Sequence, residues 1–265
     1  IASRDLLAAL ERGAIQEDGY RWIPGVSGKT CGSRWGALNA YYPTRLLPPE
    51  HNLVTGTMRK LEEHISPGGH PVHTGWMEDG CWIAITLDNL AENHLARGNG
   101  DAAARYFYAT LNHATPLVTW CEERGQEAGT PKTSGDRQHL WTPVAVVRCL
   151  RDMLVMEAED TLHLALGADR AWLASGQPLG IERASTHFGD ISYQLRFDAA
   201  ARKVTGRIAF ARRRQPEAIQ IHLRMPEDWS SRSISSTPGA DLHIVGQSLS
   251  WRRPEDTLDF ELILD

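Results

Sequence analysis

The segment 119–127, which reads TWCEERGQE, places three carboxylates, an arginine and a tryptophan within nine residues. Hydrolysis of a glycosidic bond needs two carboxyl groups flanking the bond, and an inverting enzyme separates them by about 6.5–9.5 Å to admit water. Neighbouring side chains of an extended backbone point to opposite faces, so only one of Glu122 and Glu123 can face such a site. The segment predicts a catalytic loop in which Glu122 or Glu123 activates water; a solvated acidic loop is the alternative.

A second candidate segment, 75–82, reads GWMEDGCW. Glu78 and Asp79 are candidate catalytic carboxylates, and the flanking rings of Trp76 and Trp82 could stack on a sugar. The segment precedes a predicted helix, where carboxylates are stabilised by the N-terminal end of the dipole. Helix capping by Asp79 is therefore a sufficient alternative account.

Polar and aromatic residues also gather before two other predicted helices. We expect these segments to bind substrate: the arginine, glutamine and histidine would bond to sugar hydroxyls, and the tryptophans would form platforms together with Trp76 and Trp120. The residues concerned are Arg137, Gln138, His139 and Trp141, with Arg34 and Trp35 as a weaker case. We predict that loops 76–82, 119–127 and 135–141 converge on one concave face.

Other classes of site find no support in the sequence. It has no G-x-S-x-G, P-loop, dinucleotide-binding glycine pattern or H-E-x-x-H. The four cysteines form no C-x-x-C pair, so neither a zinc site nor any other metal or cofactor is predicted. A net charge of −5 favours no nucleic-acid partner, and no apolar window is long enough for a membrane span. The chain begins with Ile in a helix-like segment without a signal-peptide pattern, as in a processed or truncated chain, so its compartment is not predicted.

Up to about residue 157, apolar residues recur with a helical period. Asp101 is a candidate N-cap, and Thr142–Pro143 combines an N-cap with proline at the first helical position. Helices are expected near 4–12, 33–42, 53–65, 80–97, 101–111 and 142–154. The long loops 13–32, 66–79 and 115–141 are typical of functional loops.

From about residue 160 the apolar residues alternate instead, as in 191–197 and 258–264. Short strands at this spacing predict an antiparallel β-sandwich. The predicted domain boundary therefore separates residues 1–158 from residues 159–265.

The order of these motifs resembles that of the six-hairpin, or (α/α)6-barrel, glycosidases, which include α-L-rhamnosidase-like and α-glucosidase- or mannosidase-like groups. Loop 119–127, followed by 135–143 opening an apolar helix, resembles their last catalytic loop and last barrel helix. The stretches 162–166 and 170–173 resemble the entry to their terminal β-domain, and 186–193 resembles the strand pair after it. The resemblance covers roughly 75–265 and is one of pattern and order.

This resemblance implies an α + β multidomain fold: a partial (α/α)6 barrel of helical hairpins followed by an antiparallel β-sandwich. In those families a glutamate in the loop is the general base. Glu123–Arg124 matches the rhamnosidase-like Glu-Arg pair, whereas Glu122 lies nearer the tryptophan, and Cys121 departs from a pattern in which glutamate directly follows tryptophan. The family barrel has about twice as many helices as this sequence predicts. An upstream fragment or second chain is therefore expected to complete the barrel and supply the acid.

The resulting hypothesis is an inverting glycoside hydrolase acting on a plant or microbial glycan, without a cofactor. One alternative is an (α/α)-toroid polysaccharide lyase, in which His70, His73 or His139 would abstract a proton beside a uronate carboxylate. Another is a non-catalytic carbohydrate-binding or scaffold protein that uses only its tryptophans.

Overall fold

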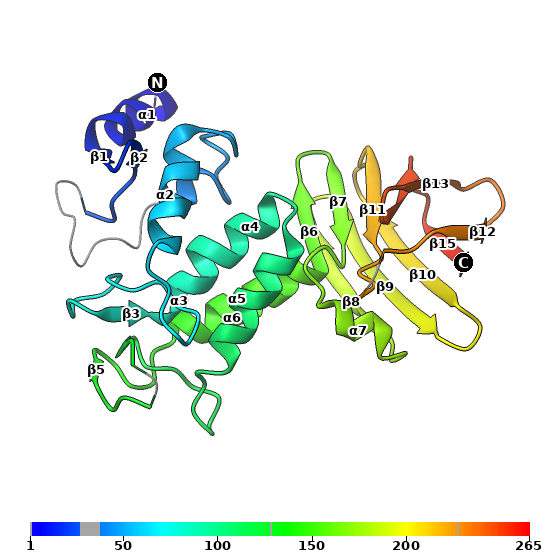
Figure 1. Cartoon of the computed structure of the whole chain (residues 1–265). Coiled ribbons are helices and arrows are strands. Elements are labelled where there is room, and N and C mark those ends of the chain that lie inside the picture. Colours follow the sequence, from blue (N-terminus) through cyan, green and yellow to red (C-terminus); the bar gives the residue numbers. More distant parts are fainter. Residues whose placement is uncertain (1, 27–37, 128, 227) are drawn as a thin grey trace. The chain divides into compact units, whose positions relative to one another are not determined.

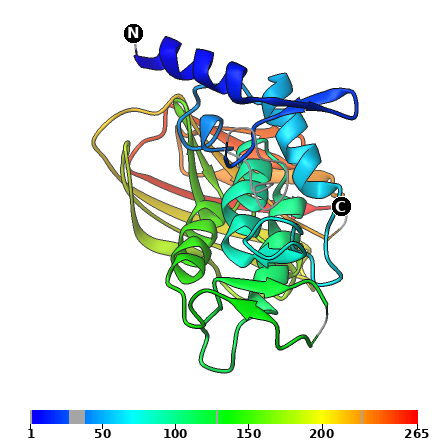
Figure 2. The ribbon, with the colours of Figure 1, turned by 90° about the vertical axis from the view of Figure 1, so that its left-hand side faces the viewer.

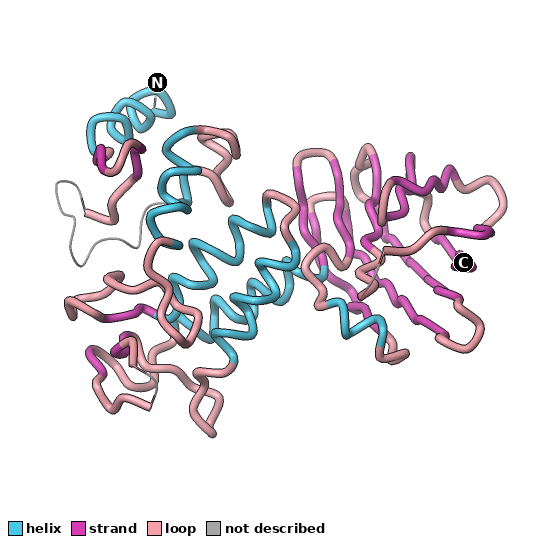
Figure 3. The backbone as a smooth tube through the Cα atoms, in the orientation of Figure 1, coloured by secondary structure: helices cyan, strands magenta, loops and turns pink. Residues whose placement is uncertain are grey.

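The computed structural model describes residues 2–26, 38–127, 129–226 and 228–265; Arg34 and Trp35 lie outside these residues. The chain divides into two compact units, Ile1–Leu150 and Arg151–Asp265 (Figure 1). Helices predominate in the first unit and strands in the second (Figure 3). The predicted domain boundary at 158–159 falls inside the second unit and stays a prediction.

The first unit begins with α1 and the β1–β2 hairpin, which follow each other directly (Figure 2). Its elements are α1 (Ala2–Gly13), β1 (Ile15–Glu17), β2 (Tyr20–Trp22), η1 (Leu38–Ala40), α2 (Asn52–Glu62), β3 (Gly80–Trp82), α3 (Ile83–Ile85), η2 (Thr86–Ala91), α4 (Glu92–Ala96), α5 (Gly100–Leu111), β4 (Glu123–Gly125), β5 (Thr133–Ser134) and α6 (Trp141–Leu154), whose last turn belongs to the second unit.

Local sequence accounts for the main helices. The apolar side chains of α2 lie on one buried face, and the His51 ring accepts the Leu53 N–H at its N-terminus. Helix α5 is capped by Asn99, whose side chain accepts the Ala102 N–H at 3.1 Å, and not by Asp101 as the sequence predicts. The cap lies two residues earlier than predicted, because the side chain of Asn99 reaches the Ala102 N–H.

The prediction of a partial (α/α)6 barrel is wrong. Among the described residues, fifteen strands form four sheets, and the helices are short. Helix α2 packs against strand β2 instead of a hairpin partner, and the predicted helix 80–97 starts as strand β3 and continues through a π-helix, η2. Periodicity identifies the face that a helix buries, but not the element that covers it, so hairpin pairing could not be read from it.

A small sheet in the order β3–β4–β5 joins three segments distant in sequence. Trp82 opposes Glu123, which opposes Ser134; likewise Cys81 opposes Arg124, which opposes Thr133. Directly opposed residues share one face of a sheet. The first trio therefore belongs to one face of this sheet and the second trio to the other.

The second unit contains two five-stranded sheets, in the orders β12–β15–β10–β9–β8 and β13–β14–β11–β7–β6. The apolar alternation predicted from the sequence forms their shared core, which includes Ile191, Leu195, Ile219 and Leu262. The pairing is not wholly antiparallel as expected, because β7 runs parallel to β11. The elements are β6 (Val155–Ala158), β7 (Thr161–Leu164), α7 (Arg170–Ala174), β8 (Leu179–Thr186), β9 (Gly189–Asp198), β10 (Lys203–Arg212), β11 (Ala218–His222), β12 (Ser231–Ser236), β13 (Asp241–Val245), β14 (Ser248–Arg252) and β15 (Thr257–Leu264).

Candidate functional site

Four aromatic side chains from two segments, 75–82 and 135–141, form a continuous row in the first unit. Trp76 meets Trp82 edge-on with ring centroids 5.3 Å apart, Trp82 meets Trp141 at 5.7 Å, and Trp141 meets His139 at 6.2 Å. Trp76 is 63% exposed, and the other three rings are half-buried. This aromatic row presents indole surface that can stack on the polarised C–H groups of a sugar ring.

The small sheet and its neighbouring turns assemble the row. Trp82 ends β3 and Trp141 begins α6. His139 is placed by its backbone N–H, which donates to the Trp120 carbonyl at 2.9 Å. The structure thus brings together the three loops that sequence composition marks as candidates.

Glu123 lies beneath the loop that carries Trp76. Its side chain is fully buried, and its Oε1 accepts the Met77 N–H at 2.8 Å. Any Cβ atom at Gly75 or Gly80 would lie 2.0 or 1.9 Å from that oxygen, so only glycine fits on either side. Burial raises the pKa of Glu123, although backbone N–H groups oppose the rise. Here Glu123 holds the loop in place and does not contact bulk water, as the predicted base would have to.

Glu122 extends away from this pocket. It is half-buried, and its Oε2 accepts the Asp136 N–H at a long 3.4 Å. The Glu122 N–H in turn donates to the Asp136 carbonyl at 2.8 Å. Glu122 therefore pairs with the start of the segment leading to α6.

The carboxylates of the 75–82 segment face other partners. Asp79 forms a 2.8 Å ion pair with Lys132, and this hydrogen bond lowers the pKa of Asp79. The predicted capping by Asp79 does not occur, because Trp82 occupies the N-cap position of α3. Glu78 is exposed, and its backbone carbonyl accepts a hydrogen bond from the ring of His73.

Trp120, predicted as a sugar platform, belongs to the core. It is 2% exposed, its indole N–H donates to the Thr110 carbonyl at 2.8 Å, and it packs with Cys81 and Ile83. Its ring offers no face to a ligand. Gln138 is exposed, and its N–H donates to Asp136 in a local turn.

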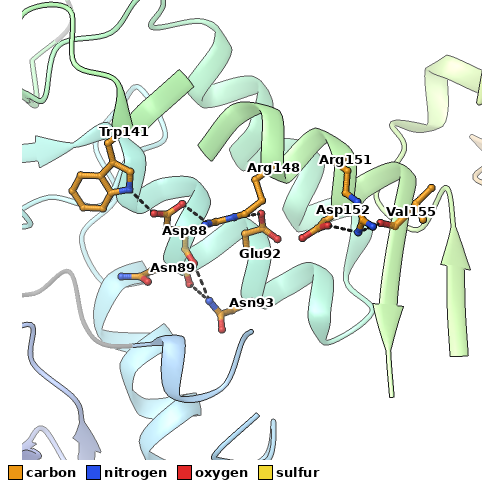
Figure 4. A network of polar contacts seen from close by, with 9 residues as sticks. All are labelled: Asp88, Asn89, Glu92, Asn93, Trp141, Arg148, Arg151, Asp152 and Val155. Carbon is orange, nitrogen blue, oxygen red and sulfur yellow. Dashed lines mark hydrogen bonds and ion pairs between the residues drawn. The ribbon is translucent and has the colours of Figure 1, made fainter. Parts of the chain in front are cut away.

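A network of charged side chains lies beside the aromatic row, at Trp141 (Figure 4). The Trp141 indole N–H donates to Asp88 at 2.6 Å, and Arg148 contacts Asp88 at 2.6 Å and Glu92 at 3.3 Å. The side chains of Asp88 and Glu92 are 15% and 1% exposed. Burial raises the pKa of Asp88, although Arg148 and Trp141 favour its ionised form. The row therefore connects directly to two carboxylates sharing one guanidinium.

Sequence reasoning missed Asp88 and Glu92. Asp88 lies on η2, a π-helix, and such segments are frequent at functional sites. Asn93 follows the distorted turn and donates to the carbonyls of Asp88 and Asn89 at 3.2 and 3.1 Å. The available signal was two carboxylates four residues apart within an apolar stretch, a spacing that places both on one helix face.

His70, one of the three histidines considered for the lyase alternative, lies in the core. His70 is buried; its Nδ1 lies 2.7 Å from the Thr86 hydroxyl and its Nε2 2.9 Å from His113 Nδ1. Burial lowers the pKa of His70 to about 3. His70 is therefore neutral near pH 7 and has no contact with solvent as a surface base would need.

This depressed pKa predicts acid sensitivity. Below about pH 6.5 the unfolded chain binds a proton at His70, whereas the folded chain does so only near pH 3. The free energy of unfolding is therefore unaffected by His70 above pH 6.5, and it falls as the pH drops from 6.5 towards 3. We expect a loss of about 2–3 kcal/mol by pH 4.5. Urea unfolding at pH 7 and 4.5 should show a smaller loss in His70→Asn than in wild type. His64→Asn, at an exposed position, is the control; equal losses in all three proteins would contradict this account.

The described part of the chain lacks two kinds of feature, a metal-binding cluster and a membrane-spanning helix. It contains no group of three or more His, Cys, Asp or Glu arranged to hold a metal ion. None of its helices combines the length and the apolar character that crossing a bilayer requires.

Comparisons with known proteins identify no family for this chain. No protein-family model matches the sequence, and no curated protein matches it. Among solved structures, the chain is similar to α-L-fucosidase isoenzyme 2 from Paenibacillus thiaminolyticus, with 12% identity and a TM-score of 0.23. The match covers 57% of this chain and 25% of that protein. A TM-score this low does not establish a shared fold.

Proposed function

We propose that the first unit binds carbohydrate at the aromatic row and that the protein is a glycoside hydrolase. The observation that carries this proposal is the contact between the row and a buried carboxylate: the Trp141 indole N–H bonds to Asp88. Stacking surface beside a partly desolvated carboxyl group is the combination that sugar binding and acid catalysis both use.

The proposed roles follow from the environments. Trp76, with its exposed ring, forms the outer platform, and Trp82 and Trp141 continue it inward. Asp88 is the candidate acid, because its carboxyl group bonds directly to the row through Trp141 and burial raises its pKa. Glu122 pairs with Asp136 and faces away from the side of the sheet that carries Trp82, so it has no role as base in this proposal.

A binding experiment tests the platform. Trp76→Ala should weaken binding of an oligosaccharide by up to about tenfold, since an aromatic contact contributes about 0.5–1.5 kcal/mol. Titration calorimetry against a panel of neutral and acidic oligosaccharides measures this, and Trp76→Phe should retain part of the affinity. Leu117→Ala removes another exposed apolar side chain, outside the row, and should have no effect. If Trp76→Ala binds as wild type does, the row is not the platform.

Product analysis separates the proposal from its rivals. New reducing ends support hydrolysis, and an unsaturated product absorbing in the ultraviolet would indicate a lyase instead. Bound sugar without any product would reject hydrolysis and identify a binding module.

A further inference from the structure

The face of the small sheet that carries Arg124 borders a cavity of about 660 Å³. Its lining includes Arg124, Arg137, His113, Cys121 and Thr133. Arg124 and Thr133 oppose each other across β4 and β5, on the face opposite to Trp82. The cavity therefore belongs to a different surface from the aromatic row, and its volume suits a small molecule.

Two arginines, Arg124 and Arg137, line this cavity. No Asp or Glu lines it within the described residues. Arg137 is exposed and has no carboxylate partner in the described ranges, and Arg124 makes only long bonds of 3.3 and 3.4 Å, to the carbonyls of Gly125 and Glu127. The residues of the first unit that the structure does not describe, 1, 27–37 and 128, contain no acidic residue in the sequence. Most guanidinium donors are thus available to a ligand.

Cys121 lines the same cavity as both arginines. Burial raises the pKa of Cys121, and the positive charges of Arg124 and Arg137 both oppose that rise. Two guanidiniums that line one cavity can pair with the same oxyanion. Arginine suits this role because its planar donors match carboxylate, sulfate and phosphate oxygens in pairs.

His113 adds a neutral acceptor. Its Nδ1 lies 2.8 Å from the Ala109 carbonyl, which can only accept, so Nδ1 carries the proton and Nε2 is left as an acceptor. Burial lowers the pKa of His113, which keeps the ring neutral at pH 7. A neutral imidazole acceptor beside two cations suits a ligand that bears hydroxyl groups as well as an anionic group.

We propose that this cavity is a second binding site, which takes a small polyhydroxylated anion whose oxyanion group pairs with Arg124 and Arg137 and whose hydroxyl donates to His113. The carboxylate of a uronic acid and the phosphate of a sugar phosphate offer the same chemistry. The proposal does not depend on the aromatic row, because the two surfaces lie on opposite faces of the sheet.

Titration calorimetry with matched ligands tests this site. Glucuronate and glucose 6-phosphate differ from glucose by an anionic group, whereas inorganic phosphate carries the charge without the sugar. We expect glucuronate or glucose 6-phosphate to bind while glucose does not. Inorganic phosphate should bind more weakly than the better of these two sugar anions, because it lacks sugar hydroxyls.

Two variants test the role of the arginines. Arg137→Gln should weaken binding of the better sugar anion at least tenfold. Lys132→Gln removes one positive charge from the same loop, at a residue that pairs with Asp79, and should leave it unchanged. Equal binding of glucose, or equal affinity in Arg137→Gln and wild type, would overturn the proposal.

The thiol gives a readout that needs no ligand. Iodoacetate and iodoacetamide alkylate the same sulfur but differ in charge, so their rate ratio at one pH reports the local potential and not the thiolate fraction. In wild type the ratio at Cys121, followed by peptide mass mapping, should favour iodoacetate more strongly than in Arg137→Gln, by roughly threefold or more. The Lys132→Gln ratio should stay near wild type. A ratio that Arg137→Gln does not change would show that this guanidinium does not act in the cavity.

Discussion

Gly80→Ala should destabilise the first unit by more than about 3 kcal/mol, a cost expected when a side chain is forced into a closed core. The new Cβ would lie 1.9 Å from Oε1 of Glu123. That carboxylate cannot move aside, because it is fully buried, bonded to the Met77 N–H and bordered on its other side by Gly75. Urea unfolding followed by circular dichroism measures the change.

The opposite residue in the sheet provides a matched control. Gly125 pairs with Gly80, and a Cβ there would meet Thr130 at 3.2 Å, a contact that a small shift relieves. We expect Gly125→Ala to cost clearly less than Gly80→Ala. Shortening the acid should also relieve the clash, so Glu123→Ala and Gly80→Ala should be strongly non-additive in a double-mutant cycle. Additive effects would mean that Glu123 does not occupy the space between the glycines.

Asp88→Asn should reduce glycan hydrolysis about 10²–10⁴-fold, the usual contribution of a general acid. The substitution keeps the shape and can still accept the Trp141 indole N–H, but it removes the ionisable proton. Oligosaccharide affinity should therefore change much less than turnover, which reducing-end release under saturating substrate measures.

The control for Asp88→Asn is Asp79→Asn, the same change at a half-buried acid that pairs with Lys132. It should retain near wild-type turnover. Loss of both binding and turnover in Asp88→Asn would indicate that the variant disrupts the network around Arg148 instead of the chemistry. Full turnover in Asp88→Asn would remove Asp88 from the mechanism.

The sequence by itself determined the features that depend on neighbours along the chain. The 3.6-residue period located the buried face of α2, and alternation located strands such as β9 and β15. Extended backbone also implied that Glu122 and Glu123 face apart, since successive side chains of a strand alternate. These are local properties, which a short window of residues expresses.

Tertiary structure alone decided which elements meet. The sequence did not show that η2 would be a π-helix bearing Asp88, or that Arg148 on α6 would bond to it, because residues sixty positions apart share no local signal. It also could not show that glycines would close around Glu123. The burial of a charge depends on every element packed around it. Glu123, which composition marks as a candidate catalytic base, is therefore buried and instead holds the loop that carries Met77.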